Sequence, residues 1–324
     1  MSQLLWTQKQ DIGTGPRSSA AMTFDSTKQR VVLFGGLVAN SPVNDTWEWD
    51  GQNWTQFADI GPKPRSDHAV AYDSARQRVV LFGGVTKSGS ADTWLNDTWE
   101  WDGVEWTQME DTGPAPRGGM AMCFDSLRSR VVLFGGNNAS MQFRDTWVWD
   151  GVSWTQEDDG GPSARTKHGM DYDSIRDRVV LFGGASVTTQ QIQTWVSGGL
   201  FSSGHYETQT INTWKFLNDT WEYDGTTWTR VGDTGPSPRY RFGLVYGAQT
   251  VLLFGGKDAG NAFRDTWEWD GVHWTQRQDI GPAARGDLAA AYDSARGHMV
   301  IFGGSDTGSP ANVFGDTWES FERP

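Results

Sequence analysis

Four charged side chains stand at equivalent points of a repeated sequence phrase. Each lies two residues after an arginine of that phrase, and the four are Asp67, Lys167, Arg241 and Asp287. A lysine offers a mobile point charge and an arginine a planar fork, so Lys167 and Arg241 together suit one carboxylate or phosphate group. We therefore predict a site for an anionic group here, with the two aspartates opposite. The open alternative is that these charges neutralise one another across water.

One further carboxyl group lies on the same stretch of chain. Asp171 comes four residues after Lys167. The other units carry small or apolar residues at that point: Thr23, Ala71, Cys123, Val245 and Ala291. A carboxyl group buried beneath Lys167 would have a shifted pKa and could serve as an acid or a base. Structural ion pairs shift pKa values as well, so Asp171 is a candidate catalytic residue and no more.

A long insertion supplies aromatic side chains near these charges. It spans residues 185–218, 34 residues where the shortest units have eight. It contains Trp195, His205, Tyr206 and Trp214. Loops of this length in compact domains are usually functional or disordered, and the aromatics favour order. We expect paired strands at 190–196 and 208–216 around a tip at 197–205, covering the apolar part of a ligand; a hairpin that only packs on its neighbour is the alternative.

Two more aromatic residues complete the candidate binding set. Tyr240 directly precedes Arg241, and Trp94 lies in the 12-residue loop of the second unit. Trp94 is, with Trp195 and Trp214, one of three tryptophans that the repeated phrase does not use, out of 19.

The elements that must position these residues follow from the repeat. A "VVLFGG"-type run begins at Val31, Val79, Val131, Val179, Val251 and Met299, and an Asp-Thr-Trp follows each one. Each unit contains an alternating segment, this continuous apolar run, an aromatic "DTWEW" segment and a short "WTQ" segment. Such segments are typical of short strands separated by turns. Four antiparallel strands in a unit of about 40 to 50 residues make one propeller blade.

The two ends of the chain predict how the propeller closes. The sixth unit stops after "DTWESFERP", without its own "WTQ" segment, whereas the chain begins with "LLWTQ" around Trp6. We expect this N-terminal strand to complete the sixth blade, because closure removes exposed sheet edges. The expectation is an all-β, six-bladed propeller of four-stranded antiparallel blades, a single domain over 1–324, with the 185–218 insertion in blade four.

These repeated features resemble a known family. The glycine pair after an apolar strand and the two tryptophans that follow are similar to kelch repeats, in particular the bacterial type, over essentially the whole chain except 185–218. The resemblance implies a β-propeller that commonly binds partners through the loops joining strands four to one and two to three, here named the top face. Some kelch-like propellers are isomerases or lyases of small polar molecules.

An arginine of the repeated phrase recurs six times, at Arg17, Arg65, Arg117, Arg165, Arg239 and Arg285. A ring of six arginines suggests an anion site, but functional sites are usually grafted onto a fold rather than repeated by it. We predict that each arginine pairs with carboxylate or carbonyl groups at the base of a loop.

Composition limits the classes of partner and compartment. The net charge of −13 would repel a nucleic-acid backbone. No apolar stretch approaches the roughly 20 residues that span a bilayer. A single cysteine, Cys123, and a start without a signal-peptide pattern lead us to expect a cytoplasmic protein. We expect no metal and no cofactor, because the five histidines are scattered and no phosphate loop or nucleophile elbow appears.

Two functions remain in competition, with a purely structural repeat protein as a third. The first is a binding propeller that recognises a protein, peptide or small anionic ligand at the top-face channel mouth. The second is a small-molecule enzyme, an isomerase or lyase, with a pocket under the 185–218 insertion. A deep cavity reaching Asp171 would favour the enzyme, and an aromatic top face would favour a macromolecular partner.

Overall fold

The computed structural model describes residues 3–9, 13–58, 60–89, 91–109, 112–157, 160–197, 205–278 and 280–323. These residues form an all-β structure without helices, and therefore without a helix long and apolar enough to cross a membrane. Within the described ranges, the strands make six four-stranded antiparallel sheets and one two-stranded ribbon. This architecture is consistent with a kelch-type β-propeller.

The sheets follow one another along the chain and are numbered here in that order. Sheet one contains β2 (Ala21–Asp25), β3 (Arg30–Phe34), β6 (Thr46–Trp49) and β7 (Trp54–Ala58), with the ribbon β4 (Leu37–Val38) and β5 (Ser41–Pro42). Sheet two contains β8 (Ala69–Asp73), β9 (Arg78–Ser88), β10 (Ala91–Trp101) and β11 (Trp106–Gln108). Sheet three contains β12 (Ala121–Asp125), β13 (Arg130–Phe134), β14 (Thr146–Trp149) and β15 (Trp154–Gln156).

The second half of the chain repeats this order. Sheet four contains β16 (Gly169–Asp173), β17 (Arg178–Val196), β18 (His205–Tyr223) and β19 (Trp228–Gly232). Sheet five contains β20 (Gly243–Gly247), β21 (Thr250–Phe254), β22 (Thr266–Trp269) and β23 (Trp274–Gln278). Sheet six contains β24 (Ala289–Asp293), β25 (His298–Phe302), β26 (Thr317–Arg323) and, from the other end of the chain, β1 (Gln3–Gln8).

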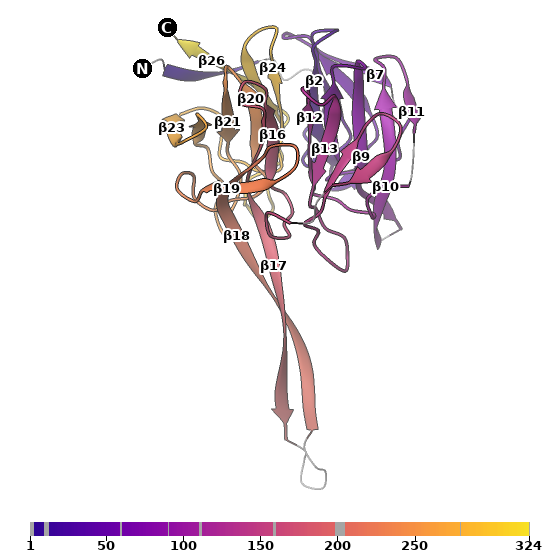
Figure 1. Ribbon diagram of the computed structural model, residues 1–324, viewed down its shortest axis with the longest axis vertical. Helices are drawn as coiled ribbons and strands as arrows, with labels where there is room; N and C mark the ends of the chain where they lie inside the picture. Colours follow the sequence, from indigo (N-terminus) through magenta and orange to yellow (C-terminus); the bar gives the residue numbers. More distant parts are fainter. Residues whose placement is uncertain are drawn as a thin grey trace.

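The first strands of the sheets lie together at the centre of the molecule. They contact one another in chain order, and β24 of sheet six contacts β2 of sheet one (Figure 1). Just before these strands, six residues named here the axial ring join neighbouring sheets: Ser19, Asp67, Gly119, Lys167, Arg241 and Asp287. The N–H of each donates to the carbonyl of the previous one, and the N–H of Ser19 donates to Asp287 at 2.8 Å. All six have positive φ, a conformation uncommon outside glycine, so the backbone fixes where the charged side chains start.

Buried tryptophans connect each sheet to the one before it. The indole N–H of each "WTQ" tryptophan donates to a threonine of the preceding sheet's "DTW" segment: Trp54 to Thr317, Trp106 to Thr46, Trp154 to Thr98, Trp228 to Thr146 and Trp274 to Thr220. Trp6 of β1 makes the equivalent bond to Thr266, at 3.0 Å. The β1 strand also pairs with β26 in a register that sets Trp6 opposite Ser320.

The repeated arginines pair with carboxylate and carbonyl groups, as the sequence predicted. Arg117, 1% exposed, donates through Nη1 and Nη2 to the two carboxylate oxygens of Asp145 at 2.6 and 2.9 Å, and to the carbonyl of Gly135. The other five pairs repeat this fork: Arg17–Asp45, Arg65–Asp97, Arg165–Asp219, Arg239–Asp265 and Arg285–Asp316. Burial alone would raise the pKa of Asp145, but the hydrogen bonds and charge of Arg117 outweigh it and lower that pKa.

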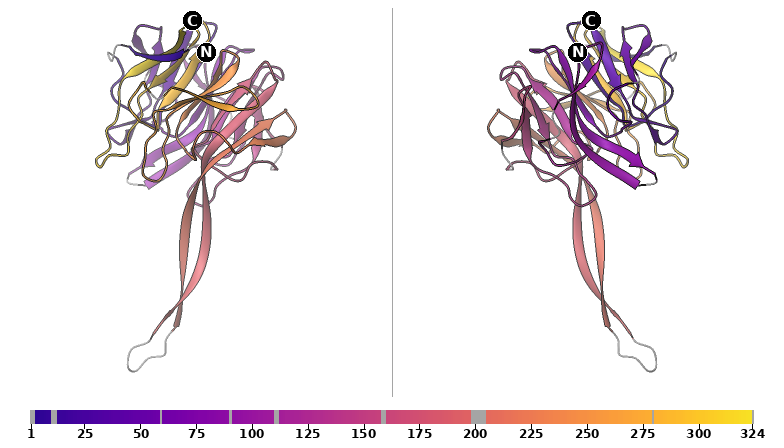
Figure 2. Two further views of the ribbon diagram at one scale, coloured as in Figure 1. Left: turned by 90° about the vertical axis from the view of Figure 1, so that its left-hand side faces the viewer. Right: turned by 90° about the vertical axis from the view of Figure 1, so that its right-hand side faces the viewer.

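The insertion forms an arm that projects from the body, as Figures 1 and 2 show. Beyond the body, β17 and β18 continue as a ribbon paired from Gly184 opposite Leu217 to Val196 opposite His205. The two segments expected to pair therefore do so. Residues 198–204, most of the expected tip, lie outside the described residues.

Candidate functional site

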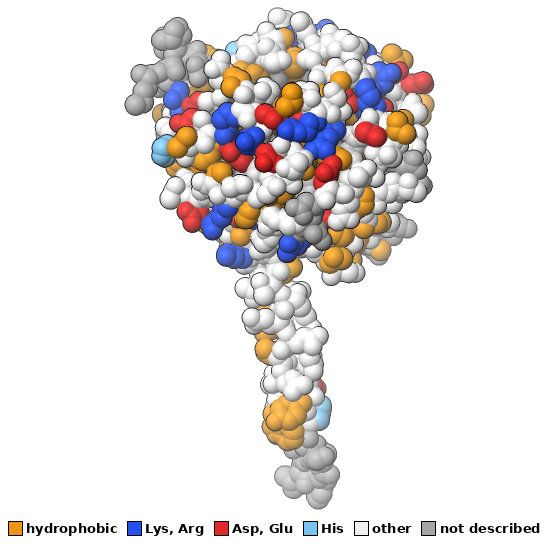
Figure 3. Space-filling model, viewed as in Figure 1, with side chains coloured by type: hydrophobic (Ala, Val, Ile, Leu, Met, Phe, Trp, Pro, Cys, Tyr) orange, Lys and Arg blue, Asp and Glu red, His pale blue; other side chains and the backbone are white. Residues whose placement is uncertain are grey.

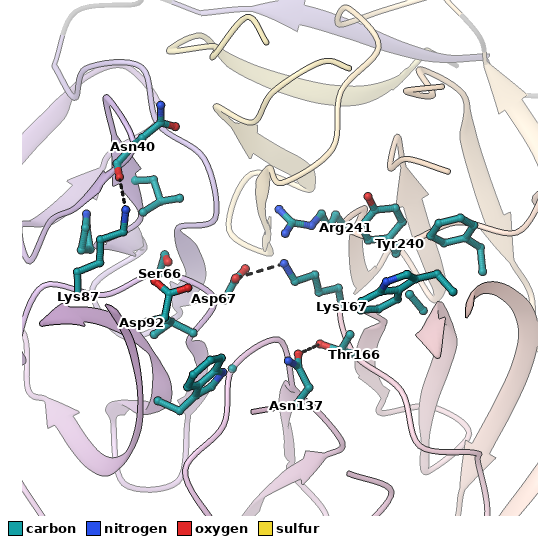
Figure 4. A pocket seen from close by; sticks show the side chains of 18 of the residues that line it. Asn40, Ser66, Asp67, Lys87, Asp92, Asn137, Thr166, Lys167, Tyr240 and Arg241 are labelled. Atoms are coloured by element: carbon teal, nitrogen blue, oxygen red, sulfur yellow. Dashed lines mark hydrogen bonds and ion pairs between the residues drawn. The ribbon is translucent and has the colours of Figure 1, made fainter. Parts of the chain in front are cut away.

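A cavity of about 820 Å³ lies where the loops of sheets one to five converge. Six of the predicted binding residues line it: Asp67, Trp94, Lys167, Trp214, Tyr240 and Arg241. Its lining comes from the segments that precede the first strands, and from the second and third strands with the connections between them. We name it the mouth cavity, and Figure 4 shows it from close by.

The axial ring places the charges of the cavity floor. The Lys167 ammonium lies 3.3 Å from a carboxylate oxygen of Asp67, and Figure 4 shows the two side chains reaching across the floor. Arg241 contacts the carboxylate of Asp287. The structure thus pairs each predicted cation with one predicted aspartate, as the neutralisation alternative anticipated, although both cations remain partly exposed.

A lysine that the sequence reasoning missed changes the charge balance. Lys257 Nζ lies 2.9 Å from the Asp287 carboxylate and donates to Ser305 at 2.8 Å. Burial and the charge of Arg241 lower the pKa of Lys257 to about 8. Asp287 therefore faces two cations. Asp287 and Lys257 lie beside the mouth cavity and do not line it, whereas the acidic residues Asp92 and Asp258 do. Comparing the residue after each glycine pair would have found Lys257, the only charged residue at that point of the six repeats.

The cavity walls are aromatic and come from two hairpins and one loop. Trp94 lies on β10, whereas Trp214 and Phe216 lie on β18 at the base of the arm. Phe216 stacks on Tyr240, with ring centroids 5.0 Å apart and planes 18° from parallel. Phe216 escaped the sequence prediction because nothing in the insertion distinguishes the aromatic residue that packs from those that do not. The walls provide flat apolar surface above a charged floor.

Three predicted binding residues lie elsewhere. Trp195 and Tyr206 face each other near the far end of the arm, with ring centroids 4.8 Å apart, and His205 is their neighbour. Their exposure is high, 55% for Trp195 and 64% for Tyr206. The expectation that they cover a ligand at the mouth is not met, because the paired strands extend outward instead of folding back over the floor.

The candidate acid or base is also apart from the mouth cavity. Asp171 lines a second cavity, of about 320 Å³, which Thr23 and Cys123 also line. Its two oxygens accept the backbone N–H groups of Tyr172 at 2.8 Å and Tyr246 at 2.6 Å. Burial raises the pKa of Asp171 to about 6, against the opposing effect of those hydrogen bonds. Asp171 is therefore not placed to exchange a proton with a ligand held at Lys167 and Arg241.

The described ranges contain no cluster of three or more His, Cys, Asp or Glu side chains arranged to hold a metal ion. The Cys123 thiol is buried, and burial raises its pKa well above the usual value. A thiol kept protonated is a poor nucleophile, so this environment does not activate Cys123 for nucleophilic attack.

Comparison with known proteins identifies the repeat family. No curated protein matches the chain. A family model described as the KLHDC2/KLHL20/DRC7 Kelch-repeats domain matches residues 104–270, which is just over half of the sequence. Kelch repeats generally mediate protein interactions. The match agrees with the glycine pairs, the two tryptophans of each unit and the four-stranded sheets, and the chain belongs to the kelch-repeat family.

Proposed function

We propose that the six sheets are the blades of one closed propeller, with the N-terminal strand as the outer strand of the sixth blade and 185–218 as an insertion beside the mouth. The pairing of β1 with β26 supports this closure. The bond from Trp6 to Thr266 supports it as well, since the other sheets make the same bond. The axial ring, whose hydrogen bonds lead back to their starting residue, gives the third support.

We propose further that the protein is a binding propeller, whose mouth cavity takes an anionic group attached to an aromatic or apolar body. The small-molecule form is an aromatic carboxylate or phosphate. The macromolecular form is a protein or peptide segment with neighbouring acidic and aromatic side chains. The observation that carries the proposal is the cavity of about 820 Å³ that sets Trp94, Trp214, Phe216 and Tyr240 around two partly exposed cations, Lys167 and Arg241.

The floor also has an unused hydrogen-bond donor. Arg241 Nε is buried and has no acceptor among the described protein atoms. An unpaired buried donor of a charged group is costly, about 1.5–3 kcal/mol per missing bond. That atom is closed to solvent, so a ligand oxygen would instead contact the exposed part of the Arg241 side chain, which is 26% exposed, and gain a charge-assisted bond there. Trp214, 54% exposed without a ligand, would lose exposed apolar surface in the complex.

The first test compares probes that share a ring and differ in charge. Isothermal titration calorimetry would use benzoate and phenyl phosphate as anions, benzyl alcohol as the neutral probe and benzylamine as the cation. We expect binding in the order anion, neutral, cation. Arg241→Gln and Trp214→Ala should each weaken anion binding by about tenfold or more, which corresponds to ~1.4 kcal/mol.

Trp195→Ala is the matched control, because Trp195 has nearly the same exposure as Trp214 but lies far from the cavity. It should leave affinity unchanged. Equal binding of all four probes, or equal losses in the two tryptophan variants, would contradict the proposed site. A pair of peptides with the same aromatic residues and either glutamates or lysines then tests the macromolecular form, and only the acidic peptide should bind.

A further inference from the structure

The arm is an exposed ribbon of only two strands. From Thr188 to Thr194 on β17, and from His205 to Lys215 on β18, every residue is exposed. Two-stranded ribbons in water are marginally stable, and a sheet usually needs three or more strands or a packed face. The outer half of the arm has only two strands and no packed face. Its strands therefore lack the stabilising contacts that a third strand or a packed face would provide.

The outer edge of β18 carries none of the usual protection against another strand. Its pairing with β19 is confined to Thr220–Tyr223, and no described strand lies beside 207–215 on that side. Exposed edges normally carry a lysine at the centre, a proline or a bulge. Here the only charges are Glu207 and Lys215, one at each end of the segment, and the arm in Figure 3 is almost free of charged side chains.

These two charges are symmetric about Ile211, four residues from each. When two copies of this segment pair antiparallel with Ile211 opposite Ile211, Glu207 of each copy lies opposite Lys215 of the other. All three side chains share one face, since their separations are even. A parallel pairing would instead set Glu207 opposite Glu207, and directly opposed like charges are destabilising.

We propose that the arm is a dimerisation element: two copies of the chain pair their β18 edges antiparallel about a twofold axis through Ile211. The product is a four-stranded sheet in the order β17, β18, β18 and β17, closed at its centre by the two isoleucines and at its ends by two ion pairs. The outer edge of β17 differs from that of β18 at its base, where the Gln142 side chain already accepts the N–H of Val187 at 2.7 Å. The dimer does not depend on what the mouth cavity binds.

The test uses the full chain in sedimentation equilibrium. We expect a monomer–dimer equilibrium for the unaltered protein and a monomer for Ile211→Lys. Ile192→Lys is the matched control: Ile192 is on β17, 38% exposed against 43% for Ile211, and its replacement should leave the dimer intact. A monomer at all concentrations for the unaltered protein, or a dimer that survives Ile211→Lys, would overturn the proposal.

Charge variants test the register without adding charge at the centre. Glu207→Lys or Lys215→Glu alone should weaken self-association by on the order of tenfold, because like charges then face each other. Mixed together, these two variants should form a heterodimer, since every facing pair is again opposite in sign. The double swap should self-associate like the unaltered chain. Failure of the mixture to associate would contradict this register.

A cysteine on the twofold axis gives an independent readout. Ile211→Cys should form an intermolecular disulfide under mild oxidation, because directly opposed residues in a sheet have suitable Cα separations. Thr213→Cys is the control: Thr213 of one copy faces Gln209 of the other, so this variant should not cross-link. The native Cys123 is buried and does not compete. Equal cross-linking of both variants would refute an axis at Ile211.

Discussion

Two buried histidines should make the fold sensitive to mild acid. His68 and His168 are 6% and 7% exposed and occupy equivalent positions on two first-strand segments. Burial, with the neighbouring Arg65 or Arg165, lowers the pKa of each from 6.5 to about 3. The folded protein therefore keeps both rings neutral at a pH where the unfolded chain protonates them.

The sign and the size of the effect follow from that difference. Above pH 6.5 the two histidines are neutral in both the folded and the unfolded protein, so they do not lower the free energy of unfolding. Between pH 6.5 and about 3 the unfolded chain takes up protons that the folded protein does not, so stability falls as pH falls. Each pH unit below 6.5 lowers the free energy of unfolding by ~1.4 kcal/mol per histidine. At pH 5 the loss is roughly 2 kcal/mol for each histidine and roughly 4 kcal/mol for both.

Phenylalanine is a suitable replacement for both histidines, because Phe242 occupies the equivalent position in the fifth repeat. His68 packs edge-on against Phe34 at 5.4 Å, and Phe242 packs in the same way against Phe182 at 5.6 Å. We expect the double variant His68→Phe/His168→Phe to fold and to lose this part of the pH dependence.

The assay is guanidinium unfolding of both proteins from pH 7.5 to 4.5. The difference in unfolding free energy between them isolates the histidines from carboxyl groups such as Asp171. Parallel curves for the two proteins over this range would refute the reasoning.

Three further results are expected. Deleting residues 1–10 should remove β1 and expose β26, so the truncated chain should aggregate or melt at a much lower temperature; calorimetry showing an unchanged melting temperature would contradict the role of Trp6 in the last sheet. Arg117→Ala should leave the partly buried Asp145, 16% exposed, with the bond from Trp147 but without its guanidinium partner, and should cost roughly 3 kcal/mol in chemical denaturation, the lower end for a broken buried pair; full stability with lost ligand binding would show that the arginine is functional. Replacing 185–218 by an eight-residue loop, as in sheet one, should leave the remaining sheets folded with a near-native melting temperature; unfolding would show that the arm supports the body.

The repeat was readable from the sequence because it rests on local rules. Alternation, continuous apolar runs and glycine pairs depend on residues within one strand or one turn, and six copies in register remove the ambiguity of any single copy. The same rules predicted the four-stranded sheets, the structural pairing of Arg117 and its equivalents, and the ribbon within 185–218. Lys167 and Arg241 were found as exceptions to the repeat, and Tyr240 as the residue before Arg241; all three line one cavity.

Other parts of the candidate site were decided only by tertiary structure. Ion pairs between residues far apart in the sequence depend on how the sheets pack. Examples are the pair of Lys167 with Asp67 and the two cations, Arg241 and Lys257, that share Asp287. The direction of the arm (Figure 2) depends on how the ribbon leaves the body, which no residue pattern within the ribbon encodes. Trp195 is therefore not among the residues that line the mouth cavity. Local patterns determine the strands and their faces because neighbouring residues share one backbone, whereas a site assembled from five sheets exists only once those sheets have packed together.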